Sequence, residues 1–439
     1  MRWTGALLMV LCWGNAYSDV LSVAVKAEED VYAFVNPNNG SGPLWSYGCS
    51  PVARLGDHVY VSQMETGVDV PPLANTRWRL LRREASGWRM VAEEAGYRQR
   101  EPAVLAQTSN QRLYLNVDDS VEPPGVKYGK AEPSLLRFVF DEGGMKQEKV
   151  LPEWAGQPNF TDHSYRGFAA DRGRGELLML NIDAKTSVQN ACLLSDAGKT
   201  LATGSITFPI RACYPQVQLR QGAAYVLAVG DIVEPVEAWR TYKFEQTKQS
   251  WDYVFRILYF TSTPDLQKQP FAPPVEIANV DASAGHISNK DLWVDEEGSA
   301  WILYTEQEVQ SALMRDKFFP GKSVTPALKL AVVKNGAVVA RRTLLEALDQ
   351  RPVGDARFQV GANGALYAVL YVGGQDAGLK LLRVRPAQEE MTLVPVPLAK
   401  PMSGFLLASV RAGNPPSNLV DLIGMRDANS VGYACFEIK

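Results

Sequence analysis

Short apolar runs alternate with polar turns along this chain in a pattern that recurs seven times. Each copy has an apolar run, a turn that is polar or contains glycine, and a second run that usually carries an aromatic residue. Such runs predict β-strands, and the short turn between them predicts a hairpin. Seven hairpins spread along one chain are typical of a β-propeller, whose blades each contain four antiparallel strands. The copies lie at 53–63, 105–117, 169–182, 218–230, 293–305, 359–371 and 410–425.

The pattern predicts an all-β fold, a seven-bladed β-propeller of four-stranded antiparallel blades that forms a single domain over residues 19–439. The last blade, at 401–439, is one strand short, whereas the segment 20–35 holds two further β-branched runs. We expect this N-terminal strand to complete the last blade and close the ring, because closure leaves few sheet edges exposed. Helical patterns are confined to short stretches near 311–318 and 343–348.

Residues 1–18 have the pattern of a secretory signal peptide. Arg2 precedes an apolar run at 6–13, and the small residues Ala16 and Ser18 place the cleavage before Asp19. The apolar run is shorter than the ~20 residues that cross a bilayer. We therefore expect a secreted or periplasmic protein with a cleavable signal peptide, no membrane span and a monomeric state.

The chain has 439 residues and a formal charge of -3, with no basic stripe of the kind that binds nucleic acid. The sequence lacks nucleotide-binding loops, dinucleotide fingerprints and metal-ligand spacings, so we predict no cofactor and no metal ligands. A structural calcium ion, held by carbonyl and carboxylate groups at the central channel, stays an open alternative. Four cysteines follow the signal peptide and either form disulfides or are buried as small apolar residues, namely Cys49, Cys192, Cys213 and Cys435.

Propeller topology makes one rim of the ring, the lead-in rim, the expected place for functional residues. The segments that lead into the innermost strand of each blade open on the same face as the loops between the second and third strands. Two of the three histidines, His163 and His286, lie at such lead-in positions, whereas His58 lies in a hairpin turn on the opposite face. The other polar or aromatic residues at lead-in positions include Trp45, Tyr47, Glu101, Asp162, Tyr165, Arg166, Arg211, Tyr214, Asn289, Asp291, Asp355 and Arg357.

Two long loops between second and third strands belong to the same rim. The loop at 230–250 carries Glu237, Trp239 and Arg240, and the loop at 305–326 carries two adjacent phenylalanines. Loops of this length in a compact domain are usually functional, so these two predict the walls of a cleft. The same polar residues can instead cap strands or form ion pairs between adjacent blades, and the sequence leaves both interpretations open.

The segment from Leu194 to Leu201 resembles the Asp box, a turn motif of sialidase-type propellers with BNR repeats. Asp196, Gly198 and Thr200 match the motif, whereas Leu194 and Leu201 replace its Ser/Thr and its Trp. In that motif the Asp side chain hydrogen-bonds the amides of its own turn. Together with the stretches 211–215, 237–240, 251–256 and 284–292, these residues make the chain similar to secreted BNR-repeat propellers, a group that includes seven-bladed polysaccharide lyases and related glycosidases.

This resemblance implies that the partner is an acidic polysaccharide or oligosaccharide, cleaved by β-elimination rather than by hydrolysis. β-Elimination needs a base for the proton beside the uronate carboxylate and an acid for the leaving oxygen. By the resemblance, His163 or His286 is the base, Tyr165 or Tyr214 is the acid, and Arg211 or Asn289 polarises the carboxylate. The residues expected to bind the substrate are Arg166, Arg211, Glu237, Trp239, Arg240, Asn289, Asp291 and Arg357.

Two alternatives to a lyase stay open. A glycoside hydrolase would need two carboxylates on either side of the scissile bond, and several lead-in carboxylates could supply them. A non-catalytic glycan-binding or protein-interaction propeller would use the same rim without an acid and a base. The sequence therefore predicts a polysaccharide-related propeller without deciding whether it is an enzyme.

Overall fold

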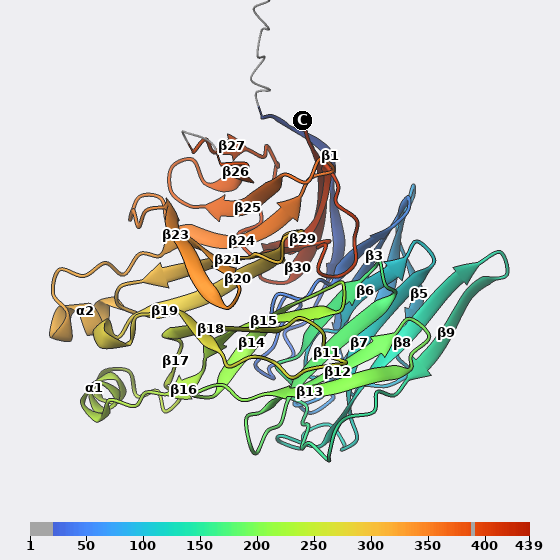
Figure 1. Ribbon diagram of the computed structural model, residues 1–439, viewed down its shortest axis with the longest axis horizontal. Coiled ribbons are helices and arrows are strands. Elements are labelled where there is room, and N and C mark those ends of the chain that lie inside the picture. The colour runs from blue at the N-terminus through green and yellow to red at the C-terminus, as the bar shows by residue number, and fades with distance from the viewer. Residues whose placement is uncertain (1–20, 388–390) are drawn as a thin grey trace, which may run out of the picture.

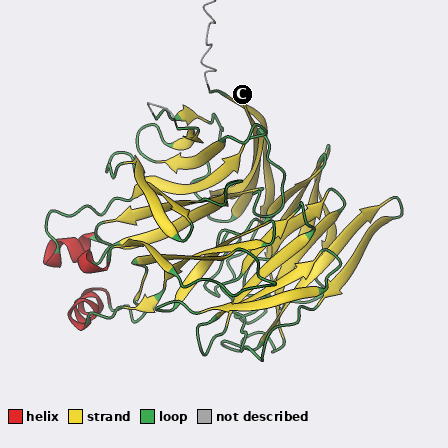
Figure 2. Cartoon of the chain, in the orientation of Figure 1, coloured by secondary structure: helices red, strands yellow, loops and turns green. Residues whose placement is uncertain are grey.

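The computed structural model describes residues 21–387 and 391–439, and the predicted signal peptide lies outside this part of the chain. The described strands form seven four-stranded antiparallel sheets, which follow one another along the sequence (Figures 1 and 2). The innermost strands contact one another in chain order, and the first of them also contacts the last blade. The predicted all-β, seven-bladed β-propeller is therefore confirmed.

The first four of the seven blades follow one another from β2 to β19. Blade one contains β2 (Val52–Leu55), β3 (His58–Thr66), β4 (Thr76–Glu84) and β5 (Gly87–Glu93). Blade two contains β6 (Val104–Ser109), β7 (Arg112–Ser120), β8 (Ala131–Asp141) and β9 (Gly144–Val150). Blade three contains β10 (Gly167–Asp171), β11 (Glu176–Ile182), β12 (Gln189–Ser195) and β13 (Thr200–Ile206). Blade four contains β14 (Ala212–Arg220), β15 (Ala223–Gly230), β18 (Ile257–Thr263) and β19 (Val275–Asn279).

The remaining blades complete the ring. Blade five contains β20 (His286–Val294), β21 (Ala300–Gln307), β22 (Ala327–Lys334) and β23 (Ala337–Leu345), preceded by the short helix η1 (Asp281–Ser283). Blade six contains β24 (Val353–Val360), β25 (Leu366–Val372), β26 (Gly378–Arg385) and β27 (Val394–Pro395). Blade seven contains β28 (Phe405–Leu407), β29 (Leu419–Asp427), β30 (Ser430–Ile438) and, from the other end of the chain, β1 (Val23–Ala33).

The N-terminal strand β1 closes the ring. It pairs antiparallel with β30, from Val23 opposite Ile438 to Ala33 opposite Ser430. Beyond this ladder, the backbone N–H of Lys439 donates to the carbonyl of Ser22 over 2.9 Å. The expectation that an N-terminal strand supplies the missing strand of the last blade is confirmed, and Figure 1 shows the blue N-terminal strand beside the red C-terminal one.

The core lies between neighbouring blades, whose sheets pack face to face. Leu178 and Leu180 of blade three, for example, share one buried cluster with Val217 and Val226 of blade four. Strands covered on both faces are apolar along most of their length, which explains the strong apolar runs that mark the second strands in the sequence. This packing fixes the inner strands, and it thereby fixes the segments that lead into them.

The two long loops of the lead-in rim each contain a helix. The loop between β15 and β18 holds α1 (Glu237–Thr247) and a two-stranded hairpin of β16 (Ile232–Val233) and β17 (Tyr253–Val254). The loop between β21 and β22 holds α2 (Ala312–Phe318), which confirms the helix expected near 311–318. The helix expected near 343–348 is wrong, because Thr343 pairs with Lys329 and continues strand β23. The two helices lie side by side at the left of Figures 1 and 2.

The Asp-box segment does not make the turn contacts that the motif implies. The Asp196 carboxylate pairs with Arg112 of blade two, so it joins two blades. The expected bonding occurs instead at Asp295, in the turn between β20 and β21. One of its oxygens accepts from the amides of Glu297 and Ser299, at 3.0 and 2.9 Å, and the other accepts from the indole N–H of Trp301 at 3.1 Å.

Cys49, Cys192, Cys213 and Cys435 are buried and unpaired, which favours the second of the two open alternatives. The side chains of Cys49 and Cys192 belong to one apolar cluster between blades. Within residues 21–387 and 391–439, no helix has the length and apolar character needed to cross a membrane.

Candidate active site

Three tyrosines meet at the lead-in rim in an unusual backbone conformation. Tyr47, Tyr165 and Tyr214 have φ values of 57°, 43° and 56°, in the left-handed region that costs a non-glycine residue about 1–2 kcal/mol. Their ring centroids lie 5.1 to 5.4 Å apart, so each ring contacts the other two. Blades one, three and four contribute one tyrosine each. Strained residues that persist because their surroundings hold them in place are concentrated at functional sites.

A buried carboxylate from blade two lies directly behind this cluster. Glu101 is 1% exposed, and one of its oxygens lies 2.7 Å from Tyr47 Oη and 2.7 Å from His163 Nδ1. Its other oxygen accepts from Ser164 Oγ at 2.6 Å. Burial alone would raise the pKa of Glu101, but the hydrogen bond and charge of His163, with Arg166 and Ser164, lower it to about 2. Glu101 is therefore ionised at neutral pH.

His163 is held by this carboxylate against the tyrosines. A carboxylate at Nδ1 selects the tautomer with its proton on Nδ1, which leaves Nε2 able to accept a proton. The imidazole and Tyr165 ring centroids are 4.2 Å apart, and Trp45 packs on the imidazole at 5.2 Å. The His163 side chain is 16% exposed, so it is reachable from solvent at the rim. The arrangement is that of an oriented general base.

Arg211 lies on the other side of Tyr165. Its guanidinium carbon is 5.0 Å from the centroid of the Tyr165 ring, and Nη1 is 2.7 Å from a carboxylate oxygen of Asp231. Burial, reinforced by the neighbouring Tyr214 and Asp231, raises the pKa of Tyr165 well above its usual range. Burial and Asp231 do the same for Tyr214. Both phenols are therefore protonated at neutral pH and can donate a proton or a hydrogen bond, but they cannot act as bases.

The row of aromatic rings continues from Tyr214 to the second predicted histidine. Phe255 lies 5.6 Å from Tyr214 and 5.7 Å from His286, measured between ring centroids. Burial, together with the charges of Lys290 and Arg256, lowers the pKa of His286 to about 4. His286 is therefore a neutral imidazole at neutral pH, and its low basicity makes it a weaker proton acceptor than an unperturbed histidine.

A cavity of about 250 Å³ opens along this part of the row. Asn289 lies on its wall and donates to the carbonyl oxygen of Tyr214 at 2.6 Å. Arg357 also lines it, with Nη2 at 3.1 Å from an oxygen of Asp355. The cavity thus combines aromatic faces with amide and guanidinium donors, the mixture that sugar-binding sites use. Its further walls include Trp45, Tyr47, Tyr214, Phe255 and His286.

Two predicted substrate contacts are buried and bonded to protein groups. Arg166 and Asp291 are each 2% exposed. Arg166 donates to the carbonyl of Asn116 at 3.0 Å, and Asp291 pairs with Arg411 at 2.7 Å. Arg166 therefore joins blade three to blade two, and Asp291 joins blade five to the segment between β28 and β29 of blade seven.

Three further predicted contacts lie on α1, apart from the tyrosine cluster. Glu237 and Arg240 are exposed there. Trp239 packs against Phe319 with ring centroids 5.4 Å apart, and the guanidinium carbon of Arg256 lies 5.1 Å from the centre of its indole. Among the residues that the structure describes, no ring or charge contact joins these three side chains to the tyrosine cluster.

Sequence reasoning places Glu101 and Tyr47 at the rim but assigns neither a role in a lyase. Their contact with His163 joins three blades, so no short motif in the sequence records it. The sequence offers one signal for the pairing of Glu101 with His163, which is that they occupy the lead-in positions of adjacent blades.

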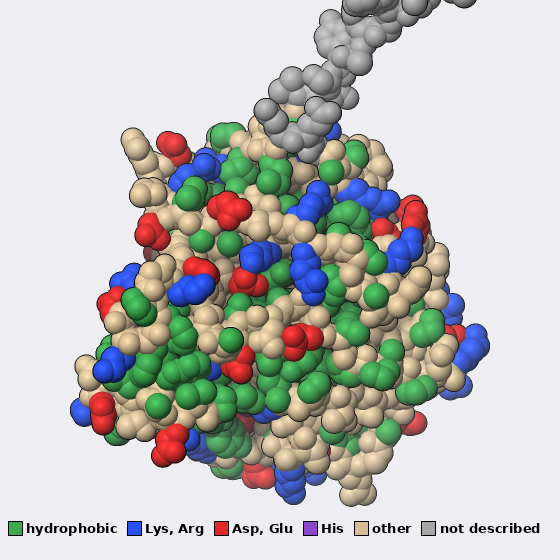
Figure 3. Space-filling view, turned by 60° about the vertical axis from the view of Figure 1, so that its left-hand side comes forward, with side chains coloured by type: hydrophobic (Ala, Val, Ile, Leu, Met, Phe, Trp, Pro, Cys, Tyr) green, Lys and Arg blue, Asp and Glu red, His purple; other side chains and the backbone are tan. Residues whose placement is uncertain are grey.

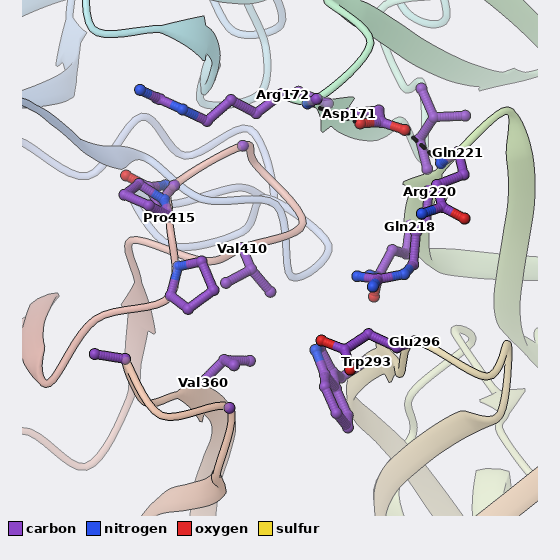
Figure 4. A pocket seen from close by; sticks show the side chains of 18 of the residues that line it. Asp171, Arg172, Gln218, Arg220, Gln221, Trp293, Glu296, Val360, Val410 and Pro415 are labelled. Carbon is purple, nitrogen blue, oxygen red and sulfur yellow. Dashed lines mark hydrogen bonds between the residues drawn. The ribbon is translucent and has the colours of Figure 1, made fainter.

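A larger cavity of about 850 Å³ lies at the opposite mouth of the channel, where the hairpins after the innermost strands converge. Figure 4 shows Gln218, Arg220 and Glu296 on one wall and Val360, Val410 and Pro415 across from them. The described residues that line this cavity include no histidine and no tyrosine. The groups suited to proton transfer are gathered at the lead-in rim, so the larger volume of this cavity does not make it the candidate active site.

No family model matches the sequence, and no curated protein matches it. Solved structures do match. The chain is similar in fold to two polysaccharide lyases. An ulvan lyase of family PL25, bound to -[GlcA(1-4)Rha3S]-, aligns with a TM-score of 0.58 and 10% identity over 93% of this chain and 95% of that one. Polysaccharide lyase Uly1 aligns with a TM-score of 0.54 and 11% identity, over 93% and 92% of the two chains.

A lectin shares the fold as well. The BP39L lectin from Burkholderia pseudomallei aligns with a TM-score of 0.51 and 11% identity, over 89% of this chain and 96% of the lectin. At such low identities the likeness concerns the fold alone, since one fold hosts many activities.

Proposed function

We propose that this protein is a polysaccharide lyase that cleaves an acidic polysaccharide by β-elimination at the lead-in rim. The observation that carries the proposal is the contiguous set of Glu101, His163, Tyr165 and Arg211. It places a carboxylate-backed imidazole, a neutral phenol and a guanidinium in successive contact at 2.7, 4.2 and 5.0 Å. Tyr165 also packs on a second neutral phenol, that of Tyr214, with ring centroids 5.1 Å apart. The cluster therefore holds the three kinds of group that uronate elimination needs: a base, an acid and a cation.

His163 acts as the base. Its Nε2 removes the proton on the uronate carbon that bears the carboxylate, and the electron pair of that C–H bond becomes the new C=C bond. The imidazole thereby becomes an imidazolium, which the ionised Glu101 stabilises through Nδ1. His286 is the weaker candidate, because its pKa of about 4 leaves it with little affinity for a proton.

Tyr214 acts as the acid. As the C=C bond forms, the bond between the neighbouring ring carbon and the glycosidic oxygen breaks, and the phenol transfers its proton to that oxygen. Tyr214 lines the cavity of the rim, whereas Tyr165 lies behind it and packs on the imidazole. We therefore assign Tyr165 the role of positioning His163 and Arg211.

Arg211 binds the uronate carboxylate. Removal of a proton beside a carboxylate requires that its charge be neutralised, because the developing carbanion would otherwise be adjacent to a second negative charge. One guanidinium nitrogen already contacts Asp231, but a guanidinium carries five N–H donors, and the Arg211 side chain is 28% exposed. Asn289 and Arg357 line the cavity that Tyr214 also lines, and they bind further polar groups of the sugar chain.

We also propose that the protein is exported, because residues 1–18 have the pattern of a cleavable signal peptide. Export would bring the site to extracellular polymers, which are too large to enter a cell. The likeness in fold to an ulvan lyase supports ulvan, a polymer containing glucuronate and sulfated rhamnose, as the first substrate to test.

The test is ultraviolet absorbance over time, with purified protein and separate solutions of ulvan, pectin, alginate and glycosaminoglycans. We expect absorbance to rise with one of them as unsaturated uronates form, and to stay flat with the His163→Ala variant. The control is His58→Ala, which changes an exposed histidine on the opposite face. A flat trace for the unmodified protein on every polymer, with binding retained, would support a glycan-binding propeller instead.

A further inference from the structure

An arm of blade four projects from the rim beside Arg211 and is braced from within. The arm comprises residues 231–256, between β15 and β18. The buried carboxylate of Glu234 lies 2.9 Å from Lys243 Nζ and 2.5 Å from a guanidinium nitrogen of Arg256. The same Lys243 ammonium lies 2.5 Å from Asp252, so the far strand of the arm is tied to its helix. Burial alone would raise the pKa of Glu234, but these two cations lower it and keep the carboxylate ionised.

This bracing fixes the position of the segment around Asp252. The amide of Glu234 donates to the carbonyl oxygen of Asp252 at 2.9 Å, and Val233 pairs with Tyr253 in the small hairpin. Residues on either side of Asp252 are therefore held before any ligand arrives. A binding group on a rigid segment loses little conformational entropy when it binds.

Trp251 is the side chain that this segment presents to solvent. It is 65% exposed, the highest exposure of any aromatic residue in the part of the chain that the structure describes. Its indole packs on Tyr253 with centroids 5.5 Å apart and planes inclined by 33°. Figure 3, turned so that the side of α1 and α2 comes forward, shows hydrophobic side chains gathered on this face.

Tyr253 connects this tryptophan to the proposed active site. The Arg211 guanidinium carbon lies 5.7 Å from the Tyr253 ring centroid and 5.0 Å from the Tyr165 ring centroid. A continuous series of contacts thus runs from Trp251 through Tyr253, Arg211 and Tyr165 to His163. Two steps of 5 to 6 Å separate Arg211 from the indole, and one sugar ring is on the order of 5 Å long, so a polymer held at Arg211 can reach the indole with the second ring along the chain.

We propose that Trp251 is an outer sugar-stacking subsite, which binds a ring of the polysaccharide beyond the uronate held by Arg211. The proposal rests on the function proposed above and extends it, because it predicts that the protein prefers a long polysaccharide to a short oligosaccharide. The apolar face of a sugar ring would stack on the open face of the indole, while its hydroxyl groups stay in water.

The chemistry of the arm favours a sugar over a protein partner. Two of its other large rings, Trp239 and Tyr242, already pack against Phe318 and Phe319 of the neighbouring loop, and Phe244 is the further exposed ring on α1. The outward-facing aromatic surface is therefore narrow, whereas a stable protein interface buries roughly 800 Å² per partner. One exposed indole near a guanidinium suits an acidic polysaccharide, in which apolar ring faces alternate with charged groups.

The experiment measures binding without cleavage. The His163→Ala protein is run through native gels that contain increasing amounts of ulvan, pectin or alginate, and retardation gives an apparent Kd for each polymer. Adding Trp251→Ala should weaken binding to the retained polymer roughly fivefold to tenfold, and Trp251→Phe should restore most of it. Phe244→Ala is the matched control, because Phe244 is an exposed ring on the same arm that makes none of these contacts.

In the otherwise unmodified protein, Trp251→Ala should raise KM for the long polymer, leave kcat unchanged and leave the rate on oligosaccharides too short to reach the indole unchanged. If the His163→Ala protein is retarded equally with and without Trp251→Ala, the subsite proposal is wrong, and the lyase proposal is unaffected. A His163→Ala protein that none of the polymers retards would overturn both. Because Trp251 is exposed, we expect its variants to unfold at the same temperature as the parent.

Discussion

One carboxylate oxygen of Glu101 lies 2.7 Å from Nδ1 of His163, although the two residues belong to different blades. Glu101 precedes strand β6, and His163 precedes strand β10. Tyr47, which precedes β2 of blade one, donates its hydroxyl hydrogen to the same oxygen at 2.7 Å. Three neighbouring blades thus converge on a single buried charge, and the orientation of the imidazole depends on how blades one to three pack together.

Replacing Glu101 by glutamine should reduce elimination more than it reduces stability. The amide preserves the shape of the side chain but cannot stabilise an imidazolium, and it allows the unproductive tautomer of His163. We expect kcat to fall at least about tenfold, measured as the initial rate of absorbance increase. The control is Glu297→Gln, which changes an exposed carboxylate on the opposite face and should leave the rate unchanged. An E101Q protein with full activity would show that the carboxylate does not support the base.

Glu101 should also make the protein sensitive to acid. Its pKa is about 2 in the folded protein, against 4.5 ordinarily, so the folded state holds the ionised form more strongly than the unfolded state does. This contribution is complete above pH 4.5 and is lost as the pH falls toward 2, on the order of 3 kcal/mol in all. Urea unfolding between pH 5 and about pH 2.5 should show a smaller decline for Glu101→Gln than for the unmodified protein.

His286 should produce a second loss of stability at higher pH. Its pKa is about 4 when folded, against 6.5 ordinarily, because burial and the charges of Lys290 and Arg256 disfavour the imidazolium. The neutral ring contributes its full stability above pH 6.5, and that contribution, about 3 kcal/mol, is lost as the pH falls toward 4. His286→Gln should flatten the dependence of unfolding free energy on pH in this window. An unchanged slope would mean that folding does not lower the pKa of this ring.

The fold could be predicted from the sequence because each blade contains a short, recognisable sequence pattern. Hairpin turns and apolar second strands occur within some 15 residues of one another, and even the contribution of β1 follows from counting the strands of the last blade. Helix α1 has no such pattern. No side chain caps its N-terminus at Val236, and it is stabilised by tertiary contacts, such as those of Lys243 with Glu234 and Trp239 with Phe319.

The site could be predicted only in part, for a related reason. Propeller topology brings lead-in residues together, so His163, Tyr165, Tyr214 and Arg211 could be named as neighbours before their contacts were known. Burial could not be inferred in the same way, and Arg166, which looks like the adjacent candidates in the sequence, faces protein groups. Contacts between residues of different blades depend on how the blades pack together, which short sequence motifs do not encode.

Replacing Arg211 by lysine should separate carboxylate recognition from catalysis. Lysine keeps a positive charge near Asp231, so the fold is preserved, but it cannot present paired N–H donors to a carboxylate. We expect KM for a polymer with free carboxylates to rise roughly tenfold. The preference for de-esterified over methyl-esterified pectin should shrink by a similar factor. Arg220→Lys, at the opposite mouth of the channel, is the control and should change neither value.

Removing single phenol hydroxyls should identify the acid. Tyr214→Phe keeps the ring and its contacts with Tyr47 and Tyr165 but leaves nothing to protonate the leaving oxygen, so kcat should fall at least about 100-fold. Tyr165→Phe should have a much smaller effect if that residue only positions its neighbours. Tyr225→Phe is the matched control, because burial also raises the pKa of Tyr225 but the residue lies near the opposite rim. A larger loss at Tyr165 than at Tyr214 would transfer the acid role to Tyr165, and full activity in both variants would show that no tyrosine serves as the acid.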